Sequence, residues 1–228
     1  MKNVVLSLKS QIPRVLKSEL HRWLAASILF SVLMVMARIA YTGTLTFVFF
    51  VWNLFLAYVP YFISSWLKDH PAWMENKKKF ALVFITWLLF IPNSFYIITD
   101  LFHLSVYYGA PLWFDVALIF SFAWNGLVLG VLSMRQMEKI FHTQFPLKNE
   151  LYFIAPLMFL NALGIFIGRF LRFNSWDVIT NPFSLIFDIV DVLLNSNNYV
   201  MAWGMIGCYS VLMTFMYLTI KKIGKPIR

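Results

Sequence analysis

Six apolar stretches, each about 20 residues long, recur along this chain of 228 residues. A helix of that length crosses roughly 30 Å of hydrocarbon. Lipid offers the backbone no hydrogen-bond partner, so each crossing segment must satisfy its own N–H and C=O groups, as a helix does. With 61% hydrophobic residues, 24 of them Phe, the composition does not suit a soluble domain of this size. The sequence therefore predicts an all-α integral membrane protein.

No internal repeat, low-complexity tract or long linker interrupts the chain, so we expect a single polytopic domain over residues 1–228. The six predicted transmembrane spans are residues 23–40, 44–66, 80–101, 113–134, 151–173 and 199–220.

The distribution of positive charge orients these spans. Sixteen of the 19 Lys and Arg residues fall in segments that alternate crossings place on one side of the membrane, and the other three are Arg38, Arg169 and Arg172. Because Lys and Arg concentrate in cytoplasmic loops, both termini are predicted to lie inside and the protein in the cell membrane. This bias also accounts for the net charge of +9, so membrane lipids, and no nucleic acid, are the expected partners.

Residues 183–195 are apolar but too short to span. At 100° per residue, Ser184, Asp188, Asp191 and Asn195 form one narrow stripe. We predict a short helix lying in, or dipping into, the outer membrane interface. The simpler alternative is an amphipathic connector with solvated acidic side chains.

The N-terminal segment also has helical periodicity. Val5, Leu8 and Ile12 recur at helical spacing, with Lys and Arg on the other faces. This pattern predicts a cytoplasmic amphipathic segment lying on anionic lipid, broken or kinked at Pro13.

The third span carries unusual polar residues after Pro92, which disturbs the preceding turn. If the helix resumes, Asn93, Tyr96, Asp100 and His103 share one face. A carboxylate and an imidazole one turn apart suit a proton relay, a general acid–base pair or two metal ligands. The alternative is that Asp100 and His103 lie in interfacial water and cap the end of the helix.

The end of the fifth span places Arg169 and Arg172 on the side that is poor in positive charge, with Asp177 close behind. The guanidinium fork matches carboxylates and phosphates. These residues could form an internal ion-pair network, an anionic-ligand site or both, and Asn174 and Trp176 could form its rim. The alternative is that both Arg side chains snorkel to the interface.

Two glycine pairs have the spacing that lets helices approach closely, Gly126 with Gly130 and Gly164 with Gly168. We expect the fourth and fifth spans to meet along these faces. Asn side chains also occur within the spans, at Asn53, Asn93, Asn125 and Asn161. They could line a transport path, but interhelical hydrogen bonding is the simpler interpretation.

Two stretches resemble motifs of a known family, the uncharacterised bacterial membrane proteins grouped as domain-of-unknown-function family thirteen sixty-one. They read Pro92-Asn93, Tyr96, Thr99-Asp100-Leu101 and His103-Leu104, then Gly168-Arg169, Arg172 and Asn174-Ser175-Trp176-Asp177. Phe95 stands where a second Pro is common in the family. The resemblance implies a short polytopic protein with a shared outer site, and it implies no particular reaction, metal or cofactor.

We therefore predict an outward-facing pocket formed by the outer ends of the third and fifth spans and the 174–195 connector. In a membrane-embedded enzyme acting on a lipid-linked or anionic substrate, the catalytic candidates are Asp100, His103 and Asp177. The substrate-binding candidates are Asn93, Tyr96, Arg169, Arg172, Asn174 and Trp176. Asp100 and Arg172 are expected to share one cavity. The alternatives are a transporter or substrate-capturing membrane subunit and a structural partner in a membrane complex.

Overall fold

All six apolar stretches form helices in the computed structural model, which describes residues 14–104, 109–145, 149–173, 177–194 and 200–223. The long helices are α2 (Arg14–Thr42), α3 (Phe49–Asp69), α5 (Lys77–Phe90), α7 (Leu112–Gln144), α8 (Leu151–Phe166) and α11 (Val200–Ile223). The shorter elements are α4 (Pro71–Glu75), α6 (Pro92–Tyr96), the 3₁₀ helix η1 (Ile97–His103), the π-helical turn η2 (Ile167–Leu171), α9 (Asp177–Thr180) and α10 (Pro182–Leu194).

These elements confirm the all-α fold class, and the described residues include six helices long and apolar enough to cross a membrane. The predicted connector helix is present as α10. The predicted amphipathic segment at the N-terminus falls mostly on residues 1–13, outside the described part of the chain.

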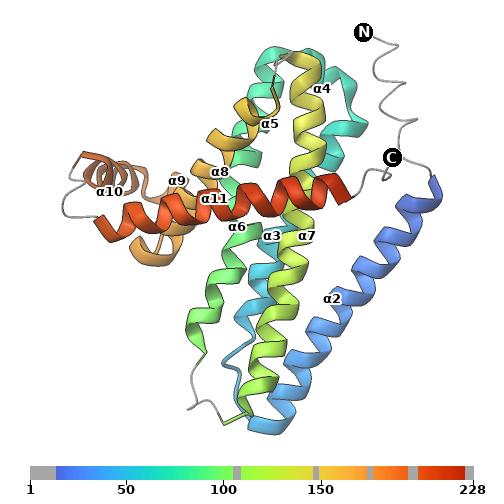
Figure 1. Ribbon diagram of the computed structural model, residues 1–228, viewed down its shortest axis with the longest axis vertical. Coiled ribbons are helices and arrows are strands. Elements are labelled where there is room, and N and C mark those ends of the chain that lie inside the picture. Colours follow the sequence, from blue (N-terminus) through green and yellow to red (C-terminus); the bar gives the residue numbers. More distant parts are fainter. Residues whose placement is uncertain (1–13, 105–108, 146–148, 174–176, 195–199, 224–228) are drawn as a thin grey trace.

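Helix α7 is the axis of the molecule and contributes to two hydrophobic clusters. Figure 1 shows it running the length of the bundle, with α2 and α3 beside its lower half. In one cluster Phe122 packs against Phe50 of α3, with ring centroids 5.5 Å apart. In the other, Met134 packs with Trp87 of α5, whose indole Nε1 donates a 2.7 Å hydrogen bond to Ser133 Oγ. The long fourth span therefore links both halves of the core.

The third span is broken at the position that Pro92 predicts. Helix α5 ends at Phe90, and Pro92 begins the short helix α6, where a missing N–H costs nothing. The side-chain amide of Asn93 donates a 2.9 Å hydrogen bond to the carbonyl of Phe90. An acceptor near the break is thereby satisfied within the apolar region, as lipid requires.

The short helix α6, which follows the break, is the element on which both glycine pairs pack. A Cβ added at Gly126 of α7 would lie 2.7 Å from the Ser94 carbonyl oxygen, and one added at Gly164 of α8 would lie 2.7 Å from Pro92 Cγ. The expectation that the fourth and fifth spans meet along their glycines is therefore wrong. Each glycine face instead contacts an opposite side of α6, because the short helix lies between α7 and α8.

The fifth span does not continue as an α-helix to its predicted end. After α8 the chain makes the π-helical turn η2, and Arg172 then adopts a left-handed conformation with a φ of 61°. A π-helix turns less per residue than an α-helix, so side chains after Phe166 leave the faces that an α-helical wheel assigns them.

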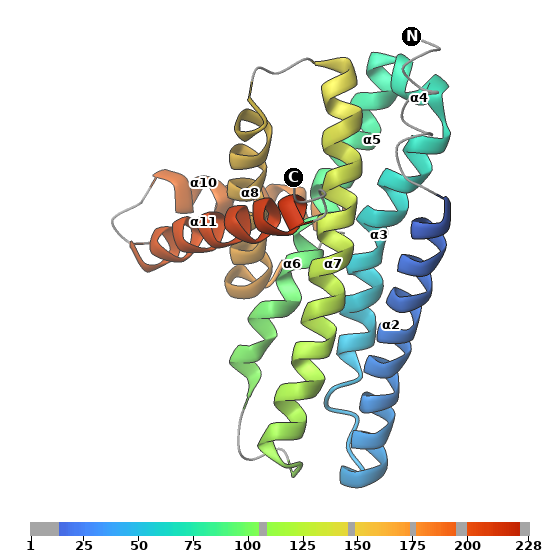
Figure 2. The ribbon, with the colours of Figure 1, turned by 45° about the vertical axis from the view of Figure 1, so that its right-hand side comes forward.

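Helix α11 lies across the bundle rather than alongside the other long helices. In both Figure 1 and Figure 2 it runs transversely to α7. It packs across α8, where the Trp203 ring is stacked on that of Phe159 with the ring centroids 6.3 Å apart. At its other end, Lys221 Nζ lies 2.6 Å from Glu138 Oε1 and also pairs with Glu150. These contacts account for its path, which the length and hydropathy of the sixth predicted span do not reveal.

Candidate functional site

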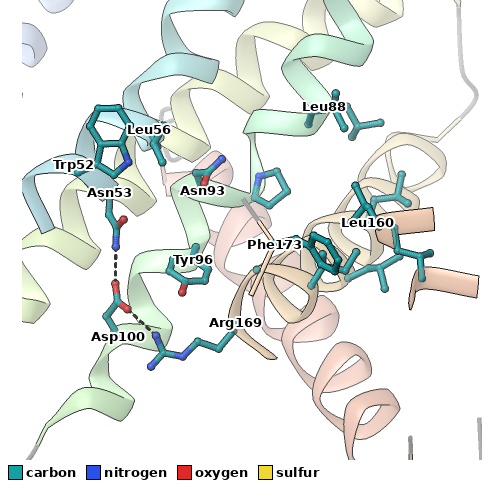
Figure 3. A pocket seen from close by; sticks show the side chains of 18 of the residues that line it. Trp52, Asn53, Leu56, Leu88, Asn93, Tyr96, Asp100, Leu160, Arg169 and Phe173 are labelled. Atoms are coloured by element: carbon teal, nitrogen blue, oxygen red, sulfur yellow. Dashed lines mark hydrogen bonds and ion pairs between the residues drawn. The ribbon is translucent and has the colours of Figure 1, made fainter. Parts of the chain in front are cut away.

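A cavity of about 560 Å³ lies between α3, the broken third span, the end of α8 and α10. Figure 3 shows that its lining is divided. Asn53, Asp100 and Arg169 gather at one end, whereas apolar side chains such as Leu88 and Leu160 occupy the other. This volume is in the range of small-molecule pockets.

The polar end is organised around the carboxylate of Asp100, which is only 1% exposed. Arg169 Nη1 of η2 donates to Asp100 Oδ1 at 2.9 Å, and Asn53 Nδ2 of α3 donates to Asp100 Oδ2 at 3.3 Å. One carboxylate thus connects the second, third and fifth spans. Burial of a charge is stabilising only with such a counter-charge and further hydrogen bonds.

Three residues of the predicted polar face line this cavity together, Asn93, Tyr96 and Asp100. Asn93 and Tyr96 lie three residues apart on α6, and Asp100 lies four residues further on, in η1. Ile97 packs against Gly126, near the middle of α7.

Arg169 lines the cavity, but Arg172 does not. The Arg172 side chain is exposed, so the expectation that it shares a cavity with Asp100 is not met. The α-helical wheel placed Arg172 on the face of Gly168, but the intervening π-helical turn changes the phase of the helix. The carboxylate is instead reached by Arg169, three residues earlier.

The other predicted site residues fall elsewhere. Asp177 begins α9, accepts a 3.0 Å hydrogen bond from Thr180 and does not line the cavity. The side chain of His103, and Asn174 and Trp176 entirely, lie outside what the structure describes.

The sequence interpretation did not connect α3 or the apolar face of α10 with this site. Asn53 drew attention as a polar residue within a span, but nothing in its spacing pointed to Asp100. Trp52 of α3 and Leu185 and Ile189 of α10 also line the cavity. Leu185 and Ile189 are four residues apart in an amphipathic helix, and this spacing places two side chains on the same face. That spacing was the available signal in the sequence.

A second buried ion pair holds Arg38, another of the three Arg residues that the predicted topology places apart from the other positive charges. Arg38 of α2 and Asp115 of α7 are 1% and 2% exposed. Two hydrogen bonds of 2.8 and 3.2 Å join them, and the guanidinium lies 3.9 Å from the centroid of the Phe47 ring. This pair fastens α2 to α7 and does not line the cavity of Asp100.

The buried Asn side chains deeper in the spans bond within the bundle. Asn125 Nδ2 donates to Ser31 Oγ of α2 at 2.9 Å, and its Oδ1 has no hydrogen-bond partner among the described residues. Asn161 is also fully buried, and its amide contacts Met158 Sδ at 3.9 Å. Neither residue lines the cavity of Asp100.

Within the described part of the chain, six helices are long and apolar enough to cross a membrane, which defines the class of multi-pass membrane proteins. The chain belongs to the family described as "Protein of unknown function (DUF1361)", whose model matches residues 52–219. The matched range begins in α3 and ends in α11, so it contains every charged residue that lines the cavity. No curated protein and no solved structure matches the chain.

Proposed function

We propose that this chain is a protein of the cell membrane whose cavity binds a lipid-linked ligand. One observation carries the proposal, the division of a single cavity of about 560 Å³ into a polar and an apolar end. A lipid-linked molecule has the same division between head group and chain. The polar end holds groups that would fix the head group, and the apolar end would bury part of the chain away from water.

The cavity is assigned to the outer half of the membrane in this proposal. Asp100 follows the break at Pro92 in the third span, toward the end remote from Lys77, Lys78 and Lys79. Positive-inside bias puts those three lysines in the cytoplasm, and so directs the Asp100 end outward.

Catalysis on the head group is the second candidate, favoured because Asp100 is a carboxylate beside the ligand space. In that role Asp100 would exchange a proton with the substrate, and Arg169 would stabilise the ionised carboxylate. Transport has less support. Asn125 and Asn161, which could extend a polar path through the bilayer, do not line the cavity.

The proposal is tested by reducing the cavity without touching its polar end. Leu160→Trp fills part of the apolar lining. Leu82→Trp is the matched control, since Leu82 is 62% exposed on α5 and does not line the cavity. Both variants and the unaltered chain would be extracted with polymer into native nanodiscs, and the bound lipids quantified by mass spectrometry.

We expect one lipid class to co-purify in stoichiometric amount with the unaltered chain and with Leu82→Trp. Leu160→Trp should lose at least about fivefold of it, corresponding to about 1 kcal/mol of binding energy. Identical lipid content in all three preparations would contradict the proposal.

A further inference from the structure

The charges lining the cavity cancel. Among the 19 described residues that line it, only Asp100 and Arg169 are charged, and they contact each other at 2.9 Å. The other polar side chains at that end are the amides of Asn53 and Asn93 and the phenol of Tyr96. The described lining therefore presents hydrogen-bond donors and acceptors with no net formal charge.

The Asp100–Arg169 pair is held in place from several directions. Asp100 also accepts a hydrogen bond from Asn53, and its side chain is almost completely buried. The guanidinium carbon of Arg169 lies 5.9 Å from the Tyr96 ring centroid and 5.6 Å from that of Phe102. These rings favour the present position of the guanidinium through cation–π attraction.

An anionic head group bound to Arg169 would either lie beside the carboxylate of Asp100, which repels it, or draw Arg169 away from Asp100. Drawing Arg169 away would leave the buried carboxylate of Asp100 without its counter-charge, which is strongly unfavourable. A cationic head group would face the converse problem at Asp100, because its carboxylate already has Arg169 and Asn53 as partners. The lining therefore favours neither a head group with a net negative charge nor one with a net positive charge.

We propose that the cavity selects a lipid whose head group carries no net charge. This inference rests on the proposed function and specifies its ligand. The shared chemistry is a head group with both donors and acceptors and balanced charge, as in a hydroxyl-bearing neutral lipid or a zwitterionic lipid. Such a head group hydrogen-bonds to the intact ion pair and the neighbouring amides without displacing either charge.

The test is a competition among three lipids with identical acyl chains. Delipidated full-length protein in neutral detergent is equilibrated with equal amounts of phosphatidylglycerol, phosphatidylethanolamine and diacylglycerol, which are anionic, zwitterionic and uncharged. Native mass spectrometry then counts each bound lipid. The cavity-specific binding of each lipid is the number bound to the unaltered chain minus the number bound to Leu160→Trp. Leu82→Trp is the control.

We expect the cavity-specific binding to favour phosphatidylethanolamine or diacylglycerol over phosphatidylglycerol by at least about fivefold. The relative counts of those two distinguish a zwitterionic ligand from an uncharged one. Asp100→Asn leaves the charge of Arg169 uncompensated, so this variant should reverse the preference toward phosphatidylglycerol. The double variant Asp100→Asn with Arg169→Gln restores a neutral lining, and should restore the original preference even if the single variant fails to fold.

Cavity-specific preference for phosphatidylglycerol in the unaltered chain would overturn this inference and leave the proposed lipid-binding function intact. The same is true of an Asp100→Asn variant that folds without any change in preference. Equal lipid counts in the unaltered chain and Leu160→Trp would instead remove the proposed function itself, and this inference with it.

Discussion

At the scale of single residues, Asp100 and Arg169 illustrate how a charge is kept in an apolar bundle. Each is expensive to bury alone, and together they satisfy one another across two spans. Breaking such a pair by removing one partner usually costs more than the pair contributes, because the other charge is left uncompensated.

Arg169→Gln should therefore lower the free energy of unfolding by about 3 kcal/mol. Arg172→Gln is the matched control, because Arg172 is an exposed side chain of the same type only three residues away. It should change stability by less than about 0.5 kcal/mol. The midpoints of denaturant unfolding in detergent measure both. Equal losses for the two variants would show that the ion pair has no special role.

Arg172 supports a second residue-scale prediction through its backbone. Its φ of 61° lies in the left-handed region, which glycine adopts without a Cβ clash. Arg172→Gly should raise the free energy of unfolding by up to about 1 kcal/mol if the side chain contributes little. A clear loss of stability, measured in the same denaturant titration, would assign the exposed guanidinium a contact of its own.

The residues of the site were predictable to different degrees for a physical reason. Asn93, Tyr96 and Asp100 were recognised as one face because the chain stays helical after Pro92, and their spacings of three and four residues keep such side chains on one side of a helix. Arg172 was misplaced because a π-helical turn leaves no mark in spacing or composition, yet it rotates everything that follows it. Asn53 could not be assigned, since contacts between distant spans have no local signal.

At the scale of elements, the short helix α6 acts as a packing centre. Its Ser94 side lies against Gly126 of α7, and its Pro92 side lies against Gly164 of α8. The glycine spacing correctly indicated that a backbone approaches closely at these positions. It did not identify the neighbour, because small residues accommodate any element that lies against them.

Gly164→Ala tests this packing. Its added Cβ would lie 2.7 Å from Pro92 Cγ, in a ring that cannot rotate away, so the variant should be destabilised by about 1–3 kcal/mol. Gly204→Ala in α11 is the control, because a Cβ there meets nothing within 4 Å. Alanine is the better helix former, so that change should be neutral or mildly stabilising. Thermal unfolding of both variants in one detergent provides the comparison.

At the scale of the whole molecule, hydropathy predicted which segments are helical but not how the last one runs. Hydropathy shows only whether a segment is long and apolar enough to cross a membrane, and α11 is both. Its transverse path depends on side-chain contacts with α8 and on Lys221 meeting Glu138 and Glu150, three residues from separate parts of the chain. Only the assembled bundle brings those charges together.

The orientation of the bundle gives the last prediction. Cys208 is the only cysteine of the 228-residue sequence. In a Cys208→Ser background, Asp177→Cys and Phe145→Cys each provide a single thiol, on opposite sides of the fifth span. Phe145 is 46% exposed beyond the end of α7, and Asp177 follows η2. A membrane-impermeant maleimide should label Asp177→Cys in intact cells, and Phe145→Cys only after permeabilisation. The Cys208→Ser parent should remain unlabelled.

This labelling pattern tests which charges orient the fifth span, because positive charges at its two ends favour opposite orientations. Positive-inside bias favours a cytoplasmic location for the Phe145 side through Arg135, Lys139 and Lys148. Arg169 and Arg172 oppose that placement, but the ion pair of Arg169 with Asp100 removes one of the two opposing charges. Reversed labelling would mean that these charges do not orient the chain, and the ligand cavity would then open toward the cytoplasm.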